Sequence, residues 1–196
     1  IESTDTLLSA ASCTTNCLAP VLKVLNDSFG IEKGFMTTVH AYTNDQVTLD
    51  VTHKKGIKER RGRACAINII PTSTGAATAI GKVLPELDGK LSGGALRVPV
   101  PDGSLIDLSL ELTEKVTEDE INSAFINASS EVLKVTTDPI VSSDVIGTSF
   151  GAVVDLALTK VLEVNGKQMV KVVAWYDNEF GYSNQMVRTA KYLMNL

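Results

Sequence analysis

A cysteine stands at the start of an expected helix, and no other feature limits the fold and chemistry of this chain as strongly. Residues 12–19 read SCTTNCLA, and apolar residues continue beyond them at helical spacing, which predicts a helix from Thr15 to about Ser28. Backbone N–H groups and the positive end of the helix dipole favour a thiolate at such a position. Cys13 is therefore a candidate nucleophile, although a lone cysteine is also a common small core residue.

The rest of the sequence alternates between strand-like and helix-like segments. Strands are expected over 34–42, 66–70, 95–100, 104–112, 152–164 and 168–176. Helices are expected over 74–84, from a capping box at Thr117 to about Leu133, and from a cap at Ser183 to the C-terminus. Turn residues at 101–103 and 165–166 predict hairpins. The expected fold class is α+β, a mostly antiparallel mixed sheet with helices on one face.

Composition argues against several classes of protein. The net charge of -5 does not point to nucleic acid or to an anionic membrane. No apolar run approaches the roughly 20 residues that span a bilayer. The three cysteines have no framework spacing, which favours a reducing compartment over a disulfide scaffold.

The domain organisation is expected to be simple. We expect residues 1–196 to form one domain and, because the chain lacks an initiator methionine, to be a fragment of a longer protein. No Gly-x-Gly-x-x-Gly follows a strand, so a dinucleotide-binding half is expected to be absent from this chain. The segment 43–63 is longer than a routine connection between two elements. Connections of this length are typical of functional or mobile loops.

Two histidines occur, and His40 is the candidate partner of Cys13. His40 closes an expected strand, where it is either a buried structural residue or an acid and base for the cysteine. A separation of 27 residues does not prove contact. Cys17 and Cys65 are interpreted as core, and the Cys-x-x-x-Cys spacing makes a metal site unlikely.

Several residues could bind anions. Residues 72–75, TSTG, open an expected helix, where hydroxyls and free N–H groups form either an anion site or simple caps. Arg97 lies in a strand that reads as buried, so it needs an anionic partner, either a protein carboxylate or a ligand phosphate. Arg60, Arg61 and Arg63 either bind anions or are solvated.

Together these segments resemble the catalytic domain of phosphorylating glyceraldehyde-3-phosphate dehydrogenase. The matching runs are SCTTNCLAP at 12–20, TTVHAYT at 37–43, PTSTGAA at 71–77, LRVP at 96–99 and WYDNE at 175–179. They follow the family's order over nearly the whole chain, and the first is highly specific. The resemblance implies a glycolytic enzyme, with NAD as cofactor and with glyceraldehyde 3-phosphate and inorganic phosphate as substrates.

The resemblance also implies a role for each site residue. Cys13 would attack the aldehyde, and His40 would activate the thiol and exchange protons. Thr43 and Arg97 match the site for the substrate's phosphate. The site for the attacking phosphate is matched by Ser12, Thr14, Thr74 and Gly75, with Arg60 or Arg61 as its cation. Asn178 and Tyr182 match residues near the nicotinamide, and no metal is implied.

The same resemblance sets expectations for partners and location. The family implies a homotetramer and a cytoplasmic location. Two departures from its pattern are a loop at 54–59 that is two or three residues longer than usual and Phe180 in place of a common tryptophan. In the family the last helix packs on the N-terminal domain, so apolar residues of this helix are expected to be exposed or to find another partner: Met186, Val187, Ala190 and Leu193.

Three other functions compete with this interpretation. Erythrose-4-phosphate dehydrogenases share the fold. A cysteine hydrolase using Cys13 and His40 would release its product by water rather than by phosphate. A non-catalytic assembly fragment would give no turnover even with a dinucleotide-binding domain supplied separately.

Overall fold

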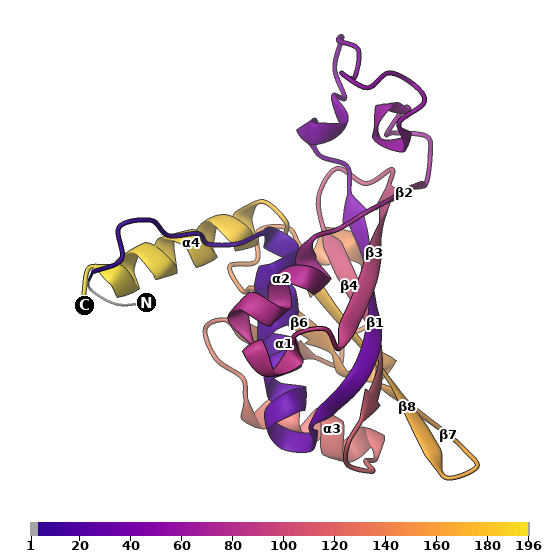
Figure 1. Cartoon of the computed structure of the whole chain (residues 1–196), viewed down its shortest axis with the longest axis vertical. Coiled ribbons are helices and arrows are strands. Elements are labelled where there is room, and N and C mark those ends of the chain that lie inside the picture. The colour runs from indigo at the N-terminus through magenta and orange to yellow at the C-terminus, as the bar shows by residue number, and fades with distance from the viewer. Residues whose placement is uncertain (1–3, 196) are drawn as a thin grey trace.

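The computed structural model describes residues 4–195, in which one eight-stranded sheet carries helices packed over one face (Figure 1). The expected domain 1–196 therefore extends beyond the described residues at both ends. The strands are β1 (Ile31–Ala41), β2 (Ile70–Thr72), β3 (Leu91–Val98), β4 (Ser104–Leu112), β5 (Leu133–Thr136), β6 (Ala152–Asp155), β7 (Lys160–Val164) and β8 (Lys167–Tyr176). The helices are α1 (Cys13–Phe29), α2 (Ala76–Val83), α3 (Glu118–Asn127) and α4 (Phe180–Leu193).

The sheet is mixed and mostly antiparallel, which confirms the expected fold class. Its strand order is β2-β3-β1-β4-β8-β6-β5, and β7 also pairs with β8. Only β1 with β3 and β5 with β6 are parallel pairs among the described strands. The hairpin at 165–166 is confirmed, since Asn165 and Gly166 both have the positive φ that such a turn requires.

The hairpin expected at 101–103 is wrong, because β1 lies between β3 and β4. At the end of β1, the Tyr42 N–H donates to Val100 O and the Ala41 N–H donates to Ser104 Oγ, both at 3.0 Å. The turn residues do reverse the chain, with Gly103 at a φ of 88°. However, a turn depends only on local sequence, whereas strand pairing depends on long-range packing. The turn alone therefore does not predict which strands are hydrogen-bonded to each other.

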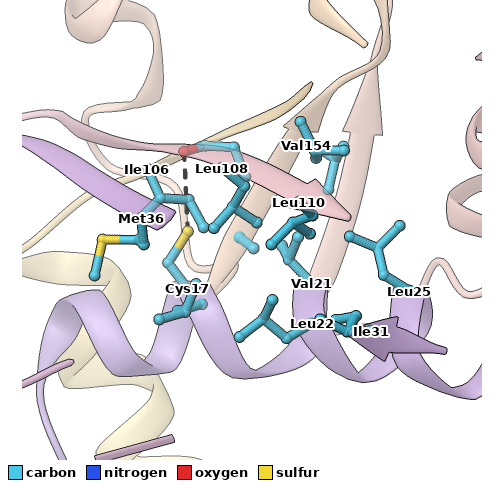
Figure 2. Close-up of a cluster of buried hydrophobic side chains, with 14 of the residues drawn as sticks. Cys17, Val21, Leu22, Leu25, Ile31, Met36, Ile106, Leu108, Leu110 and Val154 are labelled. Carbon is cyan, nitrogen blue, oxygen red and sulfur yellow. Dashed lines mark hydrogen bonds between the residues drawn. The ribbon is translucent and has the colours of Figure 1, made fainter. Parts of the chain in front are cut away.

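The core lies between α1 and the sheet. Helix α1 lies against β1, β4, β6 and β8, and α2 and α3 flank it. Its buried side chains meet those of the strands, as Figure 2 shows for Cys17, Val21, Leu22, Leu25, Met36, Ile106, Leu108 and Leu110. Cys17 is fully buried, as expected, and its thiol donates to the Ala174 carbonyl over 3.9 Å (Figure 2). This packing fixes the axis of α1, and with it the position of Cys13.

Several element boundaries differ from those expected. The strand expected at 66–70 is mostly turn, because only Ile70 reaches a neighbouring strand, where it pairs with Arg97. The helix from Thr117 keeps its capping box but ends at Asn127, and Leu133 begins β5. A 3-10 helix at Leu156–Leu158 interrupts the strand expected over 152–164.

The last helix begins three residues before Ser183. The Asp177 carboxylate accepts the N–H groups of Glu179 and Phe180 at 2.8 and 2.7 Å, which satisfies the start of α4. The Ser183 hydroxyl instead donates to the Glu179 carbonyl within the helix. The expected cap is therefore wrong. In α4 the side chains of Met186, Val187 and Ala190 are exposed and that of Leu193 is half-buried.

The long connection between β1 and β2 is irregular, as expected, and projects from the sheet (Figure 1). It contains only short 3-10 helices at Asn44–Gln46 and Arg60–Gly62. Cys65 lies here half-buried in a turn, so its expected place in the core is wrong. Within residues 4–195, no helix combines the length and apolarity needed to cross a membrane.

Candidate active site

Cys13 is the first residue of α1. The Ser12 hydroxyl caps the helix by accepting the Thr15 N–H at 3.1 Å. Two residues before Cys13, Ala11 has a φ of 57°, a left-handed conformation that is unusual for alanine. This bend turns the chain into the helix, and the packing of Cys17 one turn later holds the Cys13 side chain above the end of β1.

His40 contacts Cys13, which confirms the expected pairing in space. The Nε2 atom of His40 lies 3.4 Å from Cys13 Sγ, and the imidazole is buried at the end of β1. Its Nδ1 atom lies 2.7 Å from Ala41 O and 2.8 Å from Nη1 of Arg97. Burial and the positive charge of Arg97 lower the pKa of His40 to about 4, so the imidazole is neutral near pH 7.

The thiol of Cys13 differs from the expected thiolate. Burial raises its pKa, and this effect outweighs the side-chain and backbone hydrogen bonds of Thr14 and the charge of Arg97, which all favour the thiolate. The expectation of a lowered pKa is wrong, because burial of the sulfur disfavours the charged form more than the helix start favours it. The resting pair is therefore a neutral thiol beside a neutral imidazole.

The anionic partner that Arg97 requires is Asp45, a residue that the sequence analysis missed. Arg97 Nη2 lies 3.8 Å from Asp45 Oδ1, and Arg61 pairs with the other oxygen of the same carboxylate. Arg97 also donates to Thr43 Oγ1 at 3.1 Å. Burial alone would raise the pKa of Asp45, but hydrogen bonds and the two arginines lower it. The missed signal was an acidic residue two positions after Thr43, in the loop that follows the His40 strand.

One cavity of about 390 Å³ joins most of the expected site residues. Its lining includes Ser12, Cys13, Thr14, His40, Arg61, Thr74, Gly75 and Arg97. Arg61 is half-buried there and donates to Ser73 O at 3.1 Å, whereas Arg60 is exposed and outside the lining. Thr43 lies beside the cavity through its contact with Arg97. The geometry therefore favours Arg61 over Arg60 as the second cation.

The two residues expected near a nicotinamide lie outside this lining. Asn178 is buried, and its Oδ1 accepts the Ser104 hydroxyl at 2.7 Å. Its Nδ2 donates one hydrogen to Glu179 at 3.3 Å and carries a second that can meet a carboxamide oxygen. Tyr182 is half-buried on α4, and no contact joins it to the Cys13 cavity in the described part of the chain.

Tyr176 is a second residue that the sequence analysis missed. Its hydroxyl lies 2.9 Å from Thr14 Oγ1 and 2.8 Å from Thr38 Oγ1. Its ring meets His40 edge to face, with centroids 5.9 Å apart. The signal available was its position inside the WYDNE run itself, at the end of an expected strand. In the described residues, no group of three or more histidine, cysteine or acidic side chains is arranged to bind a metal.

Fold and site together define a class of protein, an α+β catalytic domain built around a cysteine–histidine pair beside two arginines. Comparison with known proteins then identifies the family. The chain belongs to the glyceraldehyde 3-phosphate dehydrogenase, C-terminal domain family, whose sequence model matches residues 12–178.

The chain is also similar to whole proteins of known name. It is 58% identical over 196 residues to the glyceraldehyde-3-phosphate dehydrogenases of Clostridium acetobutylicum and Clostridium pasteurianum, and 57% identical to that of Streptococcus pyogenes. Each match covers 100% of this chain and 58% of the relative. The chain thus spans somewhat more than half the length of these relatives.

Proposed function

We propose that residues 1–196 act as the catalytic domain of a glyceraldehyde-3-phosphate dehydrogenase. The reaction would convert glyceraldehyde 3-phosphate and inorganic phosphate into 1,3-bisphosphoglycerate. The contact of 3.4 Å between Cys13 Sγ and His40 Nε2 carries this proposal, because it places a nucleophile and a base together in a domain of this family.

The first step forms a carbon–sulfur bond. Cys13 sulfur attacks the aldehyde carbon while its proton passes to His40 Nε2, and His40 then gives that proton to the carbonyl oxygen, which completes the thiohemiacetal. His40 is neutral in the resting site, so it is in the correct state to accept that proton.

The second step is an oxidation to a thioester. His40 takes the hydroxyl proton as a hydride leaves the same carbon. NAD, when bound, supplies the hydride acceptor. Asn178 fits the nicotinamide end of this cofactor, because its amide is buried, oriented by Ser104 and has one N–H left to donate.

The third step transfers the acyl group to phosphate. An oxygen of hydrogen phosphate attacks the thioester carbon, and Cys13 sulfur leaves with the proton that His40 returns to it. The proton of the attacking phosphate passes to solvent. Arg61, Ser12, Thr74 and Gly75 would bind this phosphate, and Arg97 with Thr43 would bind the phosphate of the substrate.

The Asp45 carboxylate would compete with phosphate at both proposed phosphate sites. Its carboxylate pairs with Arg61 and Arg97 together, so the two cations of the site share one internal anion. A bound phosphate would compete with this carboxylate. The binding of substrate would therefore be accompanied by a rearrangement of the loop that begins at Thr43.

The binding surface for the adenosine half of NAD is proposed to lie outside this chain, since residues 1–196 contain no Gly-x-Gly-x-x-Gly. A homotetramer is proposed for the full-length protein. The exposed side chains of Phe35 and Met169, on strands of the sheet, support self-association. A cytoplasmic location is proposed, in keeping with free thiols at Cys13, Cys17 and Cys65.

A chimera tests the proposed activity. The 196 residues replace the matched part of the Clostridium acetobutylicum relative, and NADH formation is followed with glyceraldehyde 3-phosphate, with and without phosphate. Phosphate-dependent turnover that a Cys13→Ser chimera lacks is the expected result. Turnover that prefers erythrose 4-phosphate would shift the substrate, and turnover without phosphate would favour a hydrolase. A folded but inactive chimera would favour the assembly role.

A further inference from the structure

A groove between α1 and α3 lies apart from the proposed active site. Its volume is about 810 Å³, compared with about 390 Å³ for the Cys13 cavity, and no residue lines both. Natural ligand sites have volumes of about 300 to 1,000 Å³. Figure 1 shows α3 beside the C-terminal end of α1, at the end of the molecule opposite to the long connection between β1 and β2. The groove is therefore large enough to bind a ligand of its own.

Apolar side chains line this groove, although both of its walls are open to water. The apolar lining comes from the two helices and from the first residue of β5: Pro20, Val24, Phe29, Ala124, Ala128 and Leu133. All of these except Leu133 are only half-buried, and Lys23, Asp27, Ser123 and Asn127 of the same lining are exposed. Covering apolar surface is favourable by about 25 cal/mol per Å². A partner with an apolar face would therefore gain free energy by binding here.

The charged side chains of the groove are mostly acidic. The lining holds one lysine, Lys23, and three carboxylates, those of Asp27, Asp119 and Glu120. Lys23 pairs with Asp27 at 2.8 Å, so the excess negative charge lies on Asp119 and Glu120 in the first turn of α3. The phosphate groups of nucleic acid or of an anionic membrane would be repelled, whereas lysine and arginine side chains would be attracted.

The ends of the two helices add to this negative potential. A helix C-terminus carries a partial negative charge, which a basic residue in the last turn often offsets. Neither α1 nor α3 has a basic residue in its last turn. Both of these turns line the groove, through Asp27 and Phe29 of α1 and Asn127 of α3. A basic side chain of a partner would supply the charge that both helix ends lack.

The walls of the groove favour a helical partner over an extended one. The backbone N–H and C=O groups within α1 and α3 are bonded inside each helix. Leu133 is the one strand residue of the described lining, and its N–H and C=O both bond to Ser130. The groove therefore offers no strand edge to an extended peptide, whereas the side-chain ridge of a third helix fits between two helices.

We propose that the groove between α1 and α3 binds a basic amphipathic helix of a partner protein. Apolar side chains of that helix, at spacings i, i+3, i+4 and i+7, would cover Val24, Phe29 and Leu133. Its lysine or arginine side chains would lie against Asp119 and Glu120. This surface is separate from the Cys13 cavity, so the proposal does not depend on the dehydrogenase activity proposed above.

A designed peptide tests this proposal. The probe is a fluorescent synthetic peptide of about 18 residues, long enough to be helical in water, with leucine on one face and lysine on the other. A matched peptide has glutamate in place of each lysine. The lysine peptide should bind the 196-residue chain saturably in an anisotropy titration, more weakly at higher salt, and should shift amide NMR signals of α1 and α3. The glutamate peptide should bind at least about tenfold more weakly.

Variants of the chain locate the binding site. Ser123→Trp fills the groove from an exposed position and should weaken binding of the lysine peptide at least about tenfold. Asp119→Lys reverses a charge of the groove and should weaken binding about threefold to tenfold. Asp138→Lys makes the same change at an exposed residue outside the groove and should leave the affinity unchanged. Circular dichroism verifies that each variant is folded, and the two groove variants test the site independently.

Several outcomes would overturn a basic helical partner. These are no saturable binding up to about 1 mM lysine peptide, equal weakening by Asp119→Lys and Asp138→Lys, or shifted signals that lie elsewhere, such as on α4. Equal binding of the two peptides would mean that apolar contact alone attracts them. Self-association of the chain that Ser123→Trp abolishes would assign the groove to a second copy instead. Because no step measures turnover, these outcomes are distinct from failure of the proposed dehydrogenase activity.

Discussion

Nη1 of Arg97 lies 2.8 Å from His40 Nδ1, while Nε2 of the same ring faces Cys13 at 3.4 Å. The imidazole thus lies between the nucleophile and a cation of the proposed substrate site. Because the charge of Arg97 lowers the pKa of His40, an anion bound at Arg97 would offset that charge and make His40 a stronger base. In the proposed reaction, substrate binding and proton transfer would be linked through this one side chain.

Removal of Arg97's charge should raise the pKa of His40. In Arg97→Gln, the pKa is expected to rise from about 4 toward the ordinary 6.5 without reaching it, because burial continues to lower it. Imidazole signals followed by NMR against pH measure this directly. Arg60→Gln removes an exposed arginine outside the cavity and should leave the titration unchanged. An unaltered titration in Arg97→Gln would mean that burial alone sets the pKa.

The lowered pKa of His40 also predicts how stability depends on pH. In the unfolded chain His40 binds a proton below about pH 6.5, whereas in the folded chain it does so only near pH 4. The contribution of His40 to the free energy of unfolding is therefore fully present above pH 6.5 and is lost as the pH falls toward 4. Between pH 6.5 and 5 the free energy of unfolding should fall by about 2 kcal/mol from this group. Urea denaturation at each pH measures it, and His40→Asn should lack this component. An equal slope in both proteins would contradict the assignment.

Asp45 is predicted to compete with phosphate. In Asp45→Asn the carboxylate charge on Arg61 and Arg97 is lost, so inorganic phosphate should bind about threefold to tenfold more tightly, as measured by titration calorimetry. Asp50→Asn, an exposed position in the same loop, is the matched control and should leave the affinity unchanged. Weaker binding in Asp45→Asn would mean that the carboxylate orients the arginines rather than competing for them.

The start of α4 should depend on Asp177 and not on Ser183. The Asp177 carboxylate accepts N–H groups of Glu179, Phe180 and Gly147 and is buried, so Asp177→Ala should cost about 2 to 3 kcal/mol of unfolding free energy. Ser183→Ala should cost less than about 0.5 kcal/mol, because its exposed hydroxyl bonds only within the helix. Urea denaturation of the two variants compares them, and the reverse order would restore Ser183 as the cap.

The parts of the structure that the sequence predicted are those fixed by local patterns. Helix α1, strand β1 and the hairpin at Asn165-Gly166 follow from helical spacing, β-branched residues and a two-residue turn. The insertion of β1 between β3 and β4 could not be predicted, because pairing depends on which distant strand completes the core. The capping of α4 by Asp177 could not be predicted either, because it depends on a tertiary contact between Gly147 and the start of α4.

The candidate site was predictable in part of its membership but not in its charge state. Motifs pointed to Cys13, His40 and Arg97 and left Arg60 and Arg61 as alternatives, and one cavity brings Cys13, His40, Arg97 and Arg61 together. The raised pKa of Cys13 could not be predicted, because burial around the sulfur is a property of the packed site rather than of the helix start. Asp45 was missed because an irregular loop has no periodicity that shows where its side chains point.

Acyl transfer from acetyl phosphate tests the central claim most directly, since it requires only Cys13, His40 and the phosphate site. The 196-residue chain is incubated with acetyl phosphate and its peptides are analysed by mass spectrometry. The account predicts a hydroxylamine-sensitive acetyl group on Cys13 and not on Cys17 or Cys65, formed at least about tenfold more slowly in His40→Asn. Acetylation that spares Cys13, or that is equally fast in His40→Asn, would contradict a nucleophile served by this histidine.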